Sequence, residues 1–490
     1  MEILLTADRT LMSTYHDNEF IGFGTTAPPY ILPEWLYKAL FFPPLPTRDG
    51  IPTFAPYGLR KIEAQLINEG FNPLTVDSDS LKRYLDDTKV LAIHVMDPFG
   101  LGPSSTTLSR ILKTGETYSS KYFRAIFEKP EIKEAQKRGL KIIIGGPGAW
   151  QLKYRPKFLE EHQIDCVIEG EAERIIGDLF RRALKGDELP SFYEVGIKEV
   201  PSLEEIPDIR RPSINGLIEI GRGCCRGCDF CQVTLRPLRW YPLEKIEREL
   251  KLNTRSGIRH MIFHAEDVLL YGSKNTIPNR EKILELSKLG KKYALYVNWS
   301  HASMAAVAAD TKLMEETAEI LIDETQETFG AEMGIETGSA ELVKKAMRAK
   351  AHPFKPEQWP EVVKTAAGVM TDNNFVPACT LIVGLPEETD DDVVKTIELM
   401  DDLKDFKSLI VPLFFVPVGR LKDEDWFRTE RLSDLQKELL LACMRHDVRW
   451  VYDLLQTNMK GKWYRGFVNP LYRLFIRLVK RKARKAGLVF

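Results

Sequence analysis

The sequence predicts an α/β protein in which a doubly wound, Rossmann-like parallel sheet is followed by a partial (β/α)6 TIM-type barrel and a helical C-terminal extension. Three observations support this fold class. Residues 1–195 alternate short apolar runs with amphipathic helices, residues 214–418 repeat a strand–helix unit six times, and residues 419–490 show only helical periodicity. We therefore expect domains at 1–195, 214–418 and 419–490, with residues 196–213 as a proline-punctuated linker.

Composition limits the class of protein. The chain has 490 residues, 44% hydrophobic and 28% charged, with a formal net charge of −1, so it is globular and nothing in its charge favours nucleic acid as a partner. Four of the seven cysteines are clustered, which indicates a metal site in a reducing compartment rather than a disulfide framework. The N-terminus is unlike a signal peptide and no apolar run is long enough to span a bilayer. We expect a cytoplasmic protein.

The first region carries small and acidic residues where its strands end. We expect strands at Glu2–Thr6, Asn72–Val76, Val90–Val95, Lys141–Ile144 and Cys166–Ile168, and helices at Leu59–Glu69, Pro130–Arg138 and Ala172–Leu184. The residues that follow three of these strands include Asp97, Gly145, Gly146, Gly170 and Glu171. Because ligands of such sheets bind at the carboxyl ends of the strands, these residues are candidates for a ligand site.

The second region has the regular alternation of a barrel. Strands are expected to begin near Leu217, His260, Tyr293, Glu332, Ala378 and Leu409, with helices at Leu243–Leu252, Arg280–Leu289, Leu313–Thr325, Gln358–Thr371 and Asp391–Leu403. Barrel chemistry gathers on the loops that follow the strands. The clustered cysteines follow the first of these strands, where a barrel would place a catalytic loop.

Three of the clustered cysteines, Cys224, Cys228 and Cys231, have the spacing C-x3-C-x2-C. Thiolates are soft ligands that suit iron–sulfur clusters or zinc. Three thiolates on one loop can hold three irons of a [4Fe–4S] cluster and leave the fourth iron for a substrate or cofactor. A zinc site and a metal-free loop are the alternatives. Cys225 falls outside the register, and a fourth thiolate would block the remaining iron.

The run from Gly223 to Cys231, with Phe230 before the last cysteine, resembles the signature of the radical S-adenosylmethionine (SAM) superfamily. Further along, Gly334–Ser339 resembles the E-x-G-S segment of the family, and Leu381–Thr389 resembles its IxGLPxET pattern. The resemblance implies cluster binding by the three cysteines and SAM binding by Phe230, by Glu266 or Asp267, and by Glu336, Gly338, Ser339, Val383 and Gly384. Residues 266 and 267 are both acidic, and the sequence does not choose between them. A solvated acidic loop is the alternative there.

Placed before such a region, the first region resembles the cobalamin-binding domain of class B radical SAM enzymes. The resemblance implies that Asp97, Gly145, Gly146, Gly170 and Glu171 lie near a corrinoid. The family's D-x-H-x-x-G motif is absent, because Phe99 stands where its histidine would be. Cobalt would then have no protein ligand from this position, or the domain has lost the cofactor.

The last residues are strongly basic. From Met459 onward there are ten Lys or Arg residues and no acid, and the expected helix Pro470–Ala486 places cations on one face and apolar residues on the other. This profile is typical of a helix at a membrane surface, so peripheral membrane contact through residues 463–490 is expected. A helix docked on its own protein is the alternative.

The resemblance implies an enzyme that cleaves SAM to a 5′-deoxyadenosyl radical and methylates, or otherwise forms a carbon–carbon bond at, an unactivated carbon of a small molecule or lipid. An external one-electron reductant of the ferredoxin or flavodoxin type is expected as a partner, and nucleic acid is not. Two alternatives remain. One is a metal-binding protein without catalytic activity, and the other is a radical SAM enzyme that has lost cobalamin.

Overall fold

The computed structural model describes residues 2–30 and 32–458, and beyond them Pro470, Arg473, Arg477 and Arg481. The chain groups into two compact units, neither of which is continuous in sequence. The first contains Met1–Gly223, Arg236–Ala265 and Glu285–Asn298, and the second contains Cys224–Leu235, Glu266–Leu284 and Trp299–Phe490. The predicted domain boundaries at 195, 213 and 418 stay predictions.

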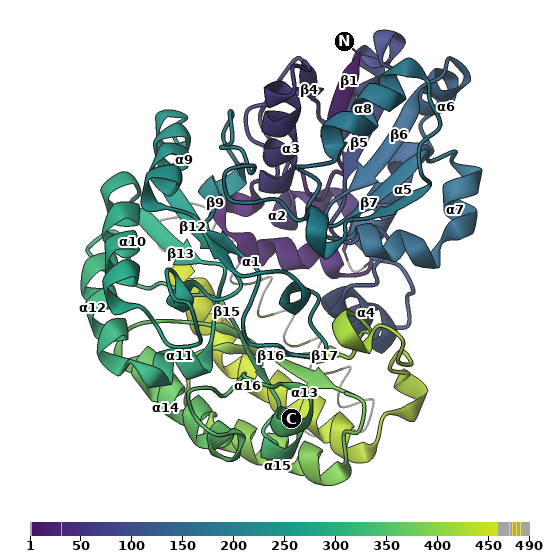
Figure 1. Cartoon of the computed structure of the whole chain (residues 1–490). Helices are drawn as coiled ribbons and strands as arrows, with labels where there is room; N and C mark the ends of the chain where they lie inside the picture. The colour runs from purple at the N-terminus through teal and green to yellow at the C-terminus, as the bar shows by residue number, and fades with distance from the viewer. Residues whose placement is uncertain are drawn as a thin grey trace. The chain divides into compact units, whose positions relative to one another are not determined.

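The first unit contains a parallel six-stranded sheet of order β4-β1-β5-β6-β7-β8 (Figure 1). Its strands are β1 (Ile3–Ala7), β4 (Pro73–Thr75), β5 (Val90–His94), β6 (Lys141–Gly145), β7 (Cys166–Glu169) and β8 (Phe192–Glu194). The five predicted strands are all present and the Rossmann-like fold is confirmed. Strand β8 was not predicted; it is a three-residue edge strand whose Phe192 pairs with Val167 of β7.

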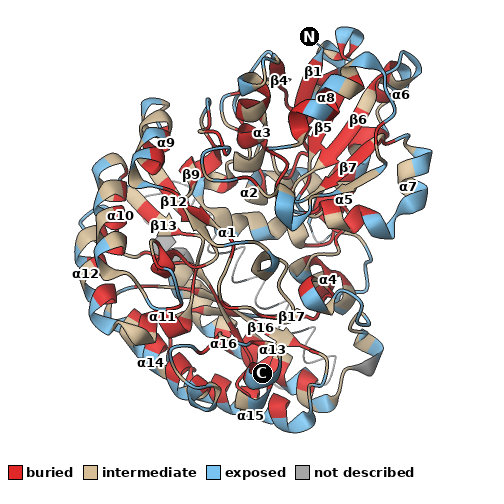
Figure 2. Cartoon of the chain, viewed as in Figure 1, coloured by how far each residue is buried: buried red, intermediate tan, exposed pale blue. Residues whose placement is uncertain are grey.

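Apolar residues alternate between the two faces of this sheet, because successive side chains of a strand point in opposite directions. In β5, Ala92 packs with helices α3 (Tyr57–Asn68) and α8 (Ile176–Lys185), whereas Leu91 packs on the opposite face with α5 (Tyr118–Phe127) and α6 (Pro130–Lys137). The strands are accordingly buried on both faces (Figure 2). The sheet therefore positions its functional residues at the strand ends.

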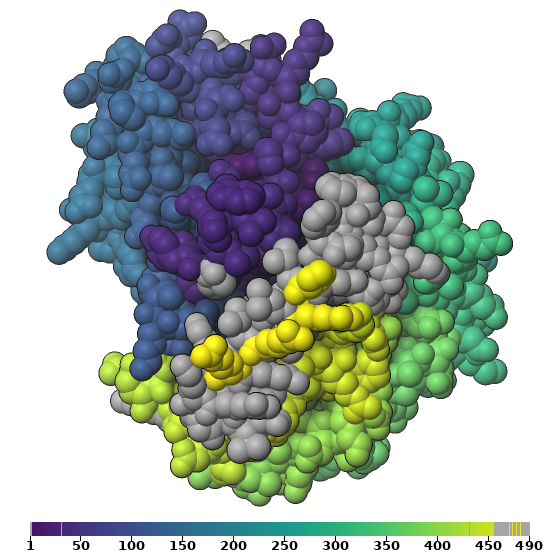
Figure 3. Space-filling view, turned by 180° about the vertical axis from the view of Figure 1, so that it is seen from behind, coloured from purple at the N-terminus to yellow at the C-terminus, as the bar shows by residue number. Residues whose placement is uncertain are grey.

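A long insertion separates β1 from β4. It contains α1 (Glu19–Gly22), α2 (Glu34–Phe41), the hairpin β2 (Thr47–Arg48) and β3 (Ile51–Pro52), and then α3. Aromatic side chains hold it to α5, and the ring of Tyr37 stacks on that of Tyr118 with centroids 4.4 Å apart. This purple-coloured part of the chain contributes to the surface seen in Figure 3.

After residue 216 the strands are those of a partial barrel and lie in two sheets, of order β13-β12-β9 and β14-β15-β16-β17. They are β9 (Leu217–Glu219), β12 (His260–His264), β13 (Tyr296–Trp299), β14 (His301–Ala302), β15 (Glu332–Glu336), β16 (Ala378–Val383) and β17 (Leu409–Phe414). The barrel fold is confirmed. The third predicted strand begins at Tyr296 instead of Tyr293, because helix α10 extends to Tyr293, and it is followed almost directly by β14.

Helices follow the strands as the periodicity predicts, with some ends displaced. The remaining helices are α4 (Pro103–Ile111), α7 (Pro156–Glu161), α9 (Leu243–Arg255), α10 (Arg280–Tyr293), α11 (Met304–Ala309), α12 (Thr311–Leu321), α13 (Ala340–Ala346), α14 (Trp359–Asp372), α15 (Asp390–Asp402) and α16 (Asp434–Asn458). Helix α8 begins at Ile176 instead of the predicted Ala172. The residues before it form a turn that carries Glu171 and Glu173.

The predicted linker, residues 196–213, belongs to the first unit and packs within it. Ile206 and Ile209 are buried, and the backbone carbonyls of Ile206 and Pro207 accept hydrogen bonds from the ammonium groups of Lys245 and Lys61 at 2.7 and 2.6 Å. Because proline has no backbone N–H, a segment with several prolines has few backbone hydrogen-bond donors. Here its carbonyls bind buried cations.

A buried ion pair connects α3 to α9 within the first unit. The Lys61 ammonium lies 2.7 Å from Oε1 of Glu249, and both side chains are at most 3% exposed. Oε2 of Glu249 accepts a hydrogen bond from the Tyr57 hydroxyl at 2.8 Å, and Oε1 accepts one from the backbone of Ile209. Glu249 thus binds residues of two helices and of the segment between them.

The predicted helix Pro470–Ala486 lies outside the described residues apart from four positions, so the membrane-surface prediction stays a prediction. Within the described part of the chain, no helix is long and apolar enough to cross a bilayer. Helix α16 packs beside β17, and its Asp447 accepts a hydrogen bond from the backbone of Ile410 at 2.7 Å.

We predict that Glu249→Ala lowers the free energy of unfolding by about 3–5 kcal/mol, because it leaves the buried Lys61 ammonium without its carboxylate. Urea denaturation monitored by circular dichroism measures this. The double variant Lys61→Met/Glu249→Leu should lose much less, since no buried charge remains unpaired. Asp434→Ala, at an exposed ion pair with Lys437, is the control and should change little. A loss as small for Glu249→Ala as for the control would contradict the prediction.

Candidate iron–sulfur and SAM site

The clustered cysteines lie on a loop whose two ends are held together by a short antiparallel hairpin. Strands β10 (Gly221–Arg222) and β11 (Arg239–Trp240) pair directly, with Arg222 opposite Arg239. Gly223 begins the loop with φ +83°, and a Cβ there would lie 2.4 Å from the carbonyl oxygen of Pro237. Only glycine fits this close approach, so the loop leaves the hairpin at a fixed angle.

Acidic residues bind both arginines of the hairpin. One oxygen of Glu171 lies 2.8 Å from the Arg222 guanidinium and the other lies 2.6 Å from that of Arg239, with all three side chains at most 12% exposed. Glu173 and Glu219 also contact Arg222, at 2.8 and 2.9 Å. Burial raises the pKa of Glu219, but the Arg222 charge outweighs burial and holds that pKa at about 2. Glu219 is therefore ionised at neutral pH.

Within the second unit, Arg226 fixes the middle of the loop. This side chain is 5% exposed, and its guanidinium donates to the carboxylate of Asp267 at 3.1 and 3.2 Å. The same group donates to the Ser303 hydroxyl and to the backbone carbonyls of Ala349, Lys350 and His352. A planar group with five donors suits this set of acceptors. Arg226 thus ties the cysteine loop to the segment that follows α13.

The segment after β17 contacts the loop near its last cysteine. The Arg420 guanidinium donates to the carboxylate of Asp229 at 2.9 Å and to the carbonyl of Gly227 at 3.2 Å, and its backbone N–H donates to the Asp229 carbonyl at 2.8 Å. Gly419 has φ +65°, and a Cβ there would lie 2.8 Å from the carbonyl oxygen of Cys231. A side chain at 419 would push the loop away.

All three register cysteines are free thiols that are at least partly buried. Burial raises the pKa of Cys224 to about 12 and that of Cys231 to about 11, and it also raises the pKa of Cys228. The thiolate form that binds iron then depends on the charge of the metal, so cluster assembly releases protons. No group of three or more His, Cys, Asp or Glu side chains in the described chain could hold a single metal ion.

The structure distinguishes the two candidate acids after β12. Asp267 is 3% exposed, and its Oδ2 accepts from Arg226 and Ser303, while its Oδ1 is buried without a hydrogen-bond partner among the described residues. Glu266 is half-buried. Its negative charge raises the pKa of Cys231, and only the burial of that thiol has a larger effect. The Glu266 charge therefore acts on Cys231, whereas the Asp267 carboxylate holds Arg226.

The SAM-contacting residues predicted from β15 and β16 fall into two groups. Glu336 has φ +66°, and its carboxylate lies 3.0 Å from the Lys350 ammonium. The Lys350 charge lowers the pKa of Cys228 and the Glu336 charge raises it. Gly338 and Ser339 instead pack on α15: a Cβ at 338 would lie 2.4 Å from the Lys395 carbonyl, and Ser339 bonds Asp392. Their small size serves this contact.

The remaining predicted SAM contacts lie in segments already described. Val383 is buried at the end of β16. Gly384 has φ +83°, donates to Glu388 at 2.9 Å, and has the Phe427 ring where its Cβ would be. Phe230 is half-buried on the loop between Cys228 and Cys231.

The predicted corrinoid residues lie at the carboxyl edge of the N-terminal sheet, except for Glu171, which binds the hairpin arginines. Asp97 accepts from Gly102 at 2.9 Å and from Gln151 at 2.6 Å. Gly146 has φ +119°, with a Cβ position 2.5 Å from the Val95 carbonyl, and Gly170 has φ +116° beside Val195. Gly145 pairs with His94. Glycine is required at 146 and 170 because neighbouring residues fill the space that a side chain would need, so the backbone lies close to them at this edge.

Sequence reasoning missed the arginines. Arg222, Arg226, Arg239 and Arg420 hold the loop, and only Arg226 carried a signal, as a single cation inside the cysteine register.

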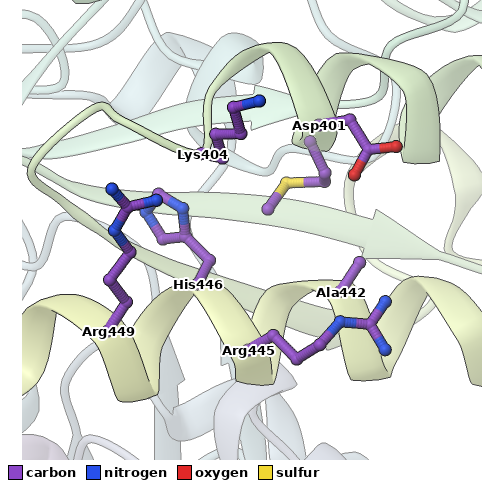
Figure 4. Close-up of a pocket in the computed structure, with 7 residues that line it drawn as sticks. Asp401, Lys404, Ala442, Arg445, His446 and Arg449 are labelled. Atoms are coloured by element: carbon purple, nitrogen blue, oxygen red, sulfur yellow. The ribbon is translucent and has the colours of Figure 1, made fainter. Parts of the chain in front are cut away.

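A surface pocket lies between α15 and α16 and is lined by residues that include Lys404, Arg445, His446 and Arg449 (Figure 4). It contains no residue of the cysteine loop and none of the glycines at the ends of β6 and β7. His446 bonds Ser408 there at 3.0 Å, and the pocket belongs to the packing of these helices.

Comparison with known proteins agrees with this site. Residues 218–400 match the radical SAM superfamily. The chain is 24% identical over 317 residues to the tRNA-2-methylthio-N(6)-dimethylallyladenosine synthase of Thermotoga petrophila, across 62% of this chain and 67% of that protein. It is 30% identical over 290 residues to a Methanocaldococcus jannaschii protein named as a methylthiotransferase, across 55% of this chain and 60% of that protein. Both relatives thus extend beyond the matched region.

Among solved structures, the chain is similar to the radical SAM methyltransferase TsrM from Kitasatospora setae, solved with cobalamin and a [4Fe–4S] cluster bound. The TM-score is 0.56 with 13% identity, covering 86% of this chain and 77% of that one. At this identity the likeness establishes the fold, in which an N-terminal parallel sheet precedes a partial barrel. Residues 218–400, which contain the register of Cys224, Cys228 and Cys231, thus match the model of the radical SAM superfamily.

Proposed function

We propose that the protein is a radical SAM enzyme that uses a [4Fe–4S] cluster, SAM and cobalamin to methylate, or otherwise form a carbon–carbon bond at, an unactivated carbon. One observation carries the proposal: a three-cysteine loop is bound by the buried Arg226, and the charge of Glu266 acts on Cys231. When bound, the cluster and SAM supply a carbon-centred radical, and cobalamin supplies a methyl group.

Each part of the site then has a task. Cys224, Cys228 and Cys231 hold three irons, and Arg226 with Asp267 keeps the loop in place. A carboxylate binds an ammonium through charge-assisted hydrogen bonds, so Glu266 orients the amino group of SAM. The buried Oδ1 of Asp267 is a second acceptor in the same segment. Glu336 already pairs with Lys350, and this pair sets the charge near Cys228.

Cobalamin binding is supported by the N-terminal sheet and its glycine edge. Gly145, Gly146 and Gly170 follow neighbouring strands, and the sheet has the position in the chain that the corresponding sheet of TsrM has. A basic C-terminal segment, residues 463–490, favours a lipid-containing surface as the location of the substrate. That part of the proposal depends on the sequence alone.

Methylthio transfer to a nucleoside is the second candidate, because the sequence relatives carry that name. This chemistry needs a sulfur donor in addition to SAM. Before Cys224 the chain has a single cysteine, Cys166, which is fully buried in β7. An iron–sulfur sulfur donor therefore has no ligands in the first 223 residues, and methyl transfer is favoured. A metal protein without catalytic activity would not need Glu266 beside the loop.

Cys228→Ser should abolish formation of 5′-deoxyadenosine from SAM and lower iron per chain, because it removes a cluster ligand. Cys225→Ser, its neighbour outside the register, is the matched control and should retain both. Anaerobic reconstitution with iron and sulfide, followed by iron analysis and chromatography of the nucleoside, measures the two effects. Wild-type protein that binds a cluster but forms no 5′-deoxyadenosine would support the non-catalytic alternative.

Glu266→Gln should weaken SAM binding about ten- to a hundredfold while iron per chain stays constant, because the amide loses one charged hydrogen bond. Asp267→Asn should instead lower iron per chain, because Arg226 loses its buried counter-charge. Equilibrium dialysis of reconstituted protein with SAM, together with iron analysis, separates these effects. The assignment of the two acids is reversed if Asp267→Asn weakens SAM binding and Glu266→Gln does not.

Reconstitution with hydroxocobalamin should give one corrinoid per chain in addition to one cluster, measured by absorbance after gel filtration. A protein with one cluster and no corrinoid would rule out cobalamin-borne methyl transfer. Residues 1–195 would then serve substrate recognition instead. Appearance of a methylthio product from a nucleoside substrate would favour the second candidate.

A further inference from the structure

The sheet β14-β15-β16-β17 of the second unit has two unlike faces (Figure 1). The side chains of one face are at most 1% exposed, and they belong to Met333, Ile335, Cys379, Leu381, Val383, Ile410 and Phe414. On the other face, the alternate residues of β16 and β17 are only partly buried, and Val411 is 36% exposed. Parallel sheets are usually covered on both faces. This second face, which we call the open face, is therefore left partly uncovered in the described part of the chain.

The strand register arranges the open face in rows that cross the sheet, because paired residues of neighbouring parallel strands point to the same side. The rows are His301–Glu332–Ala378–Leu409, Gly334–Thr380–Val411 and Ile382–Leu413. On the β14 and β15 side, Nε2 of His301 lies 3.5 Å from Oε2 of Glu332. Strands β16 and β17 contain no charged residue. The open face thus changes from polar to apolar across the sheet.

The ion pair of Glu336 and Lys350 borders the apolar half of the open face. A Cβ at Gly334 would collide with Oε1 of Glu336 and lie 2.8 Å from the Lys350 ammonium, so the pair lies directly over this glycine. Oε2 of Glu336 accepts a hydrogen bond from the Thr380 hydroxyl at 3.3 Å. Thr380 is paired with Val411 on β17, and neighbouring strands are about 4.8 Å apart. Val411 therefore lies one strand spacing from the residue that binds the pair.

The open face is continuous with the candidate cluster site. Arg226 of the cysteine loop donates a hydrogen bond to the backbone carbonyl of Lys350 at 3.1 Å. Burial raises the pKa of Cys228 and the Lys350 charge lowers it, so the ammonium acts on this thiol. From the loop, contacts lead through the ion pair to Thr380 and then to Val411. A ligand on β16 and β17 would therefore lie beside the cluster site.

The side chains of the apolar half select the chemistry of this ligand. Ile382, Leu409, Val411 and Leu413 offer only aliphatic carbon, and the Thr380 hydroxyl is already bonded to the ion pair. A charged group placed here would lose water without gaining a partner, whereas hydrocarbon is stabilised by leaving water. From Leu409 to Leu413 the strand extends over about 13 Å, since each residue adds about 3.3 Å. This length suits an extended chain.

We propose that the apolar half of the open face, on β16 and β17, binds the hydrocarbon segment of the substrate, and that this segment is an aliphatic chain. The inference rests on the proposed radical SAM function and adds the chemical class of the substrate. An aliphatic chain supplies the unactivated carbon that the proposed reaction needs. The observations that carry the inference are the register and side chains of one sheet, and they are independent of the basic C-terminal residues.

Binding of an apolar fluorescent probe to the full-length protein, reconstituted with iron and sulfide, tests the proposal. Diphenylhexatriene fluoresces in hydrocarbon surroundings and very little in water. We expect saturable binding of this probe that n-dodecanol reverses and the polar chain tetraethylene glycol does not. No saturable binding would mean that the face is covered, for example by C-terminal residues of this chain, and would overturn the proposal. Displacement by tetraethylene glycol as readily as by n-dodecanol would also overturn it.

A matched pair of valine variants locates the probe. Val411 and Val394 are each 36% exposed, but Val394 belongs to helix α15. Val411→Asp should weaken probe binding about tenfold or more, because the probe would then contact a charge, and Val394→Asp should leave binding unchanged. Val411→Thr keeps the β-branched shape and should weaken binding about threefold or more, which covers the case that the aspartate variant does not fold. Equal affinities of the Val411 and Val394 variants would overturn the proposal.

The proposed function and this inference fail in different ways. Protein that forms 5′-deoxyadenosine from SAM, but whose probe binding does not depend on Val411, would overturn the inference alone. Protein whose probe binding depends on Val411, but which forms no 5′-deoxyadenosine, would overturn the proposed function while the hydrocarbon site stands.

Discussion

The carboxylate of Glu171 is the constraint on which the cysteine loop depends. Its two oxygens bind Arg222 and Arg239, which lie opposite each other at the ends of the loop. A bidentate carboxylate between two guanidinium groups fixes distance and orientation together. The network is also buried, so loss of the Glu171 carboxylate would remove the counter-charge that Arg239 has among the described residues, while Arg222 would keep Glu173 and Glu219.

The body of the loop depends on hydrogen bonds because it has little apolar surface to bury. Between Cys224 and Cys231, Phe230 is the one large apolar side chain. Arg226 binds residues that follow β12, β14 and α13, and Arg420 binds the loop from the segment after β17. Segments far apart in sequence thus converge on eight residues. Weakening any of them is expected to affect the geometry of the whole loop.

Sequence periodicity predicted most of the framework, because apolar runs such as those of β1, β5 and β6 are buried on both faces and so carry a strong signal. It missed β8, whose three residues are too few to show a period. The cysteine register predicted the cluster ligands from spacing alone. The spacing of residues in the sequence does not show, however, which side chains they contact in the fold. Glu171, predicted near a corrinoid, binds arginines, and Gly338 and Ser339, predicted near SAM, pack on α15; these contacts were not foreseen, and the ligand contacts stay predictions. The choice between Glu266 and Asp267 depended on which carboxylate Arg226 occupies.

The anchored segment 196–213 has a consequence for how such a protein can be divided. Its carbonyls bind the ammonium groups of Lys61 and Lys245, and its isoleucines are buried. A gene cut at this segment would yield two products, each with exposed apolar surface and an unsatisfied lysine. The order of the regions along the chain therefore does not mean that each region folds on its own. Exchange of the N-terminal sheet between related proteins would succeed only if the segment and both lysines moved with it.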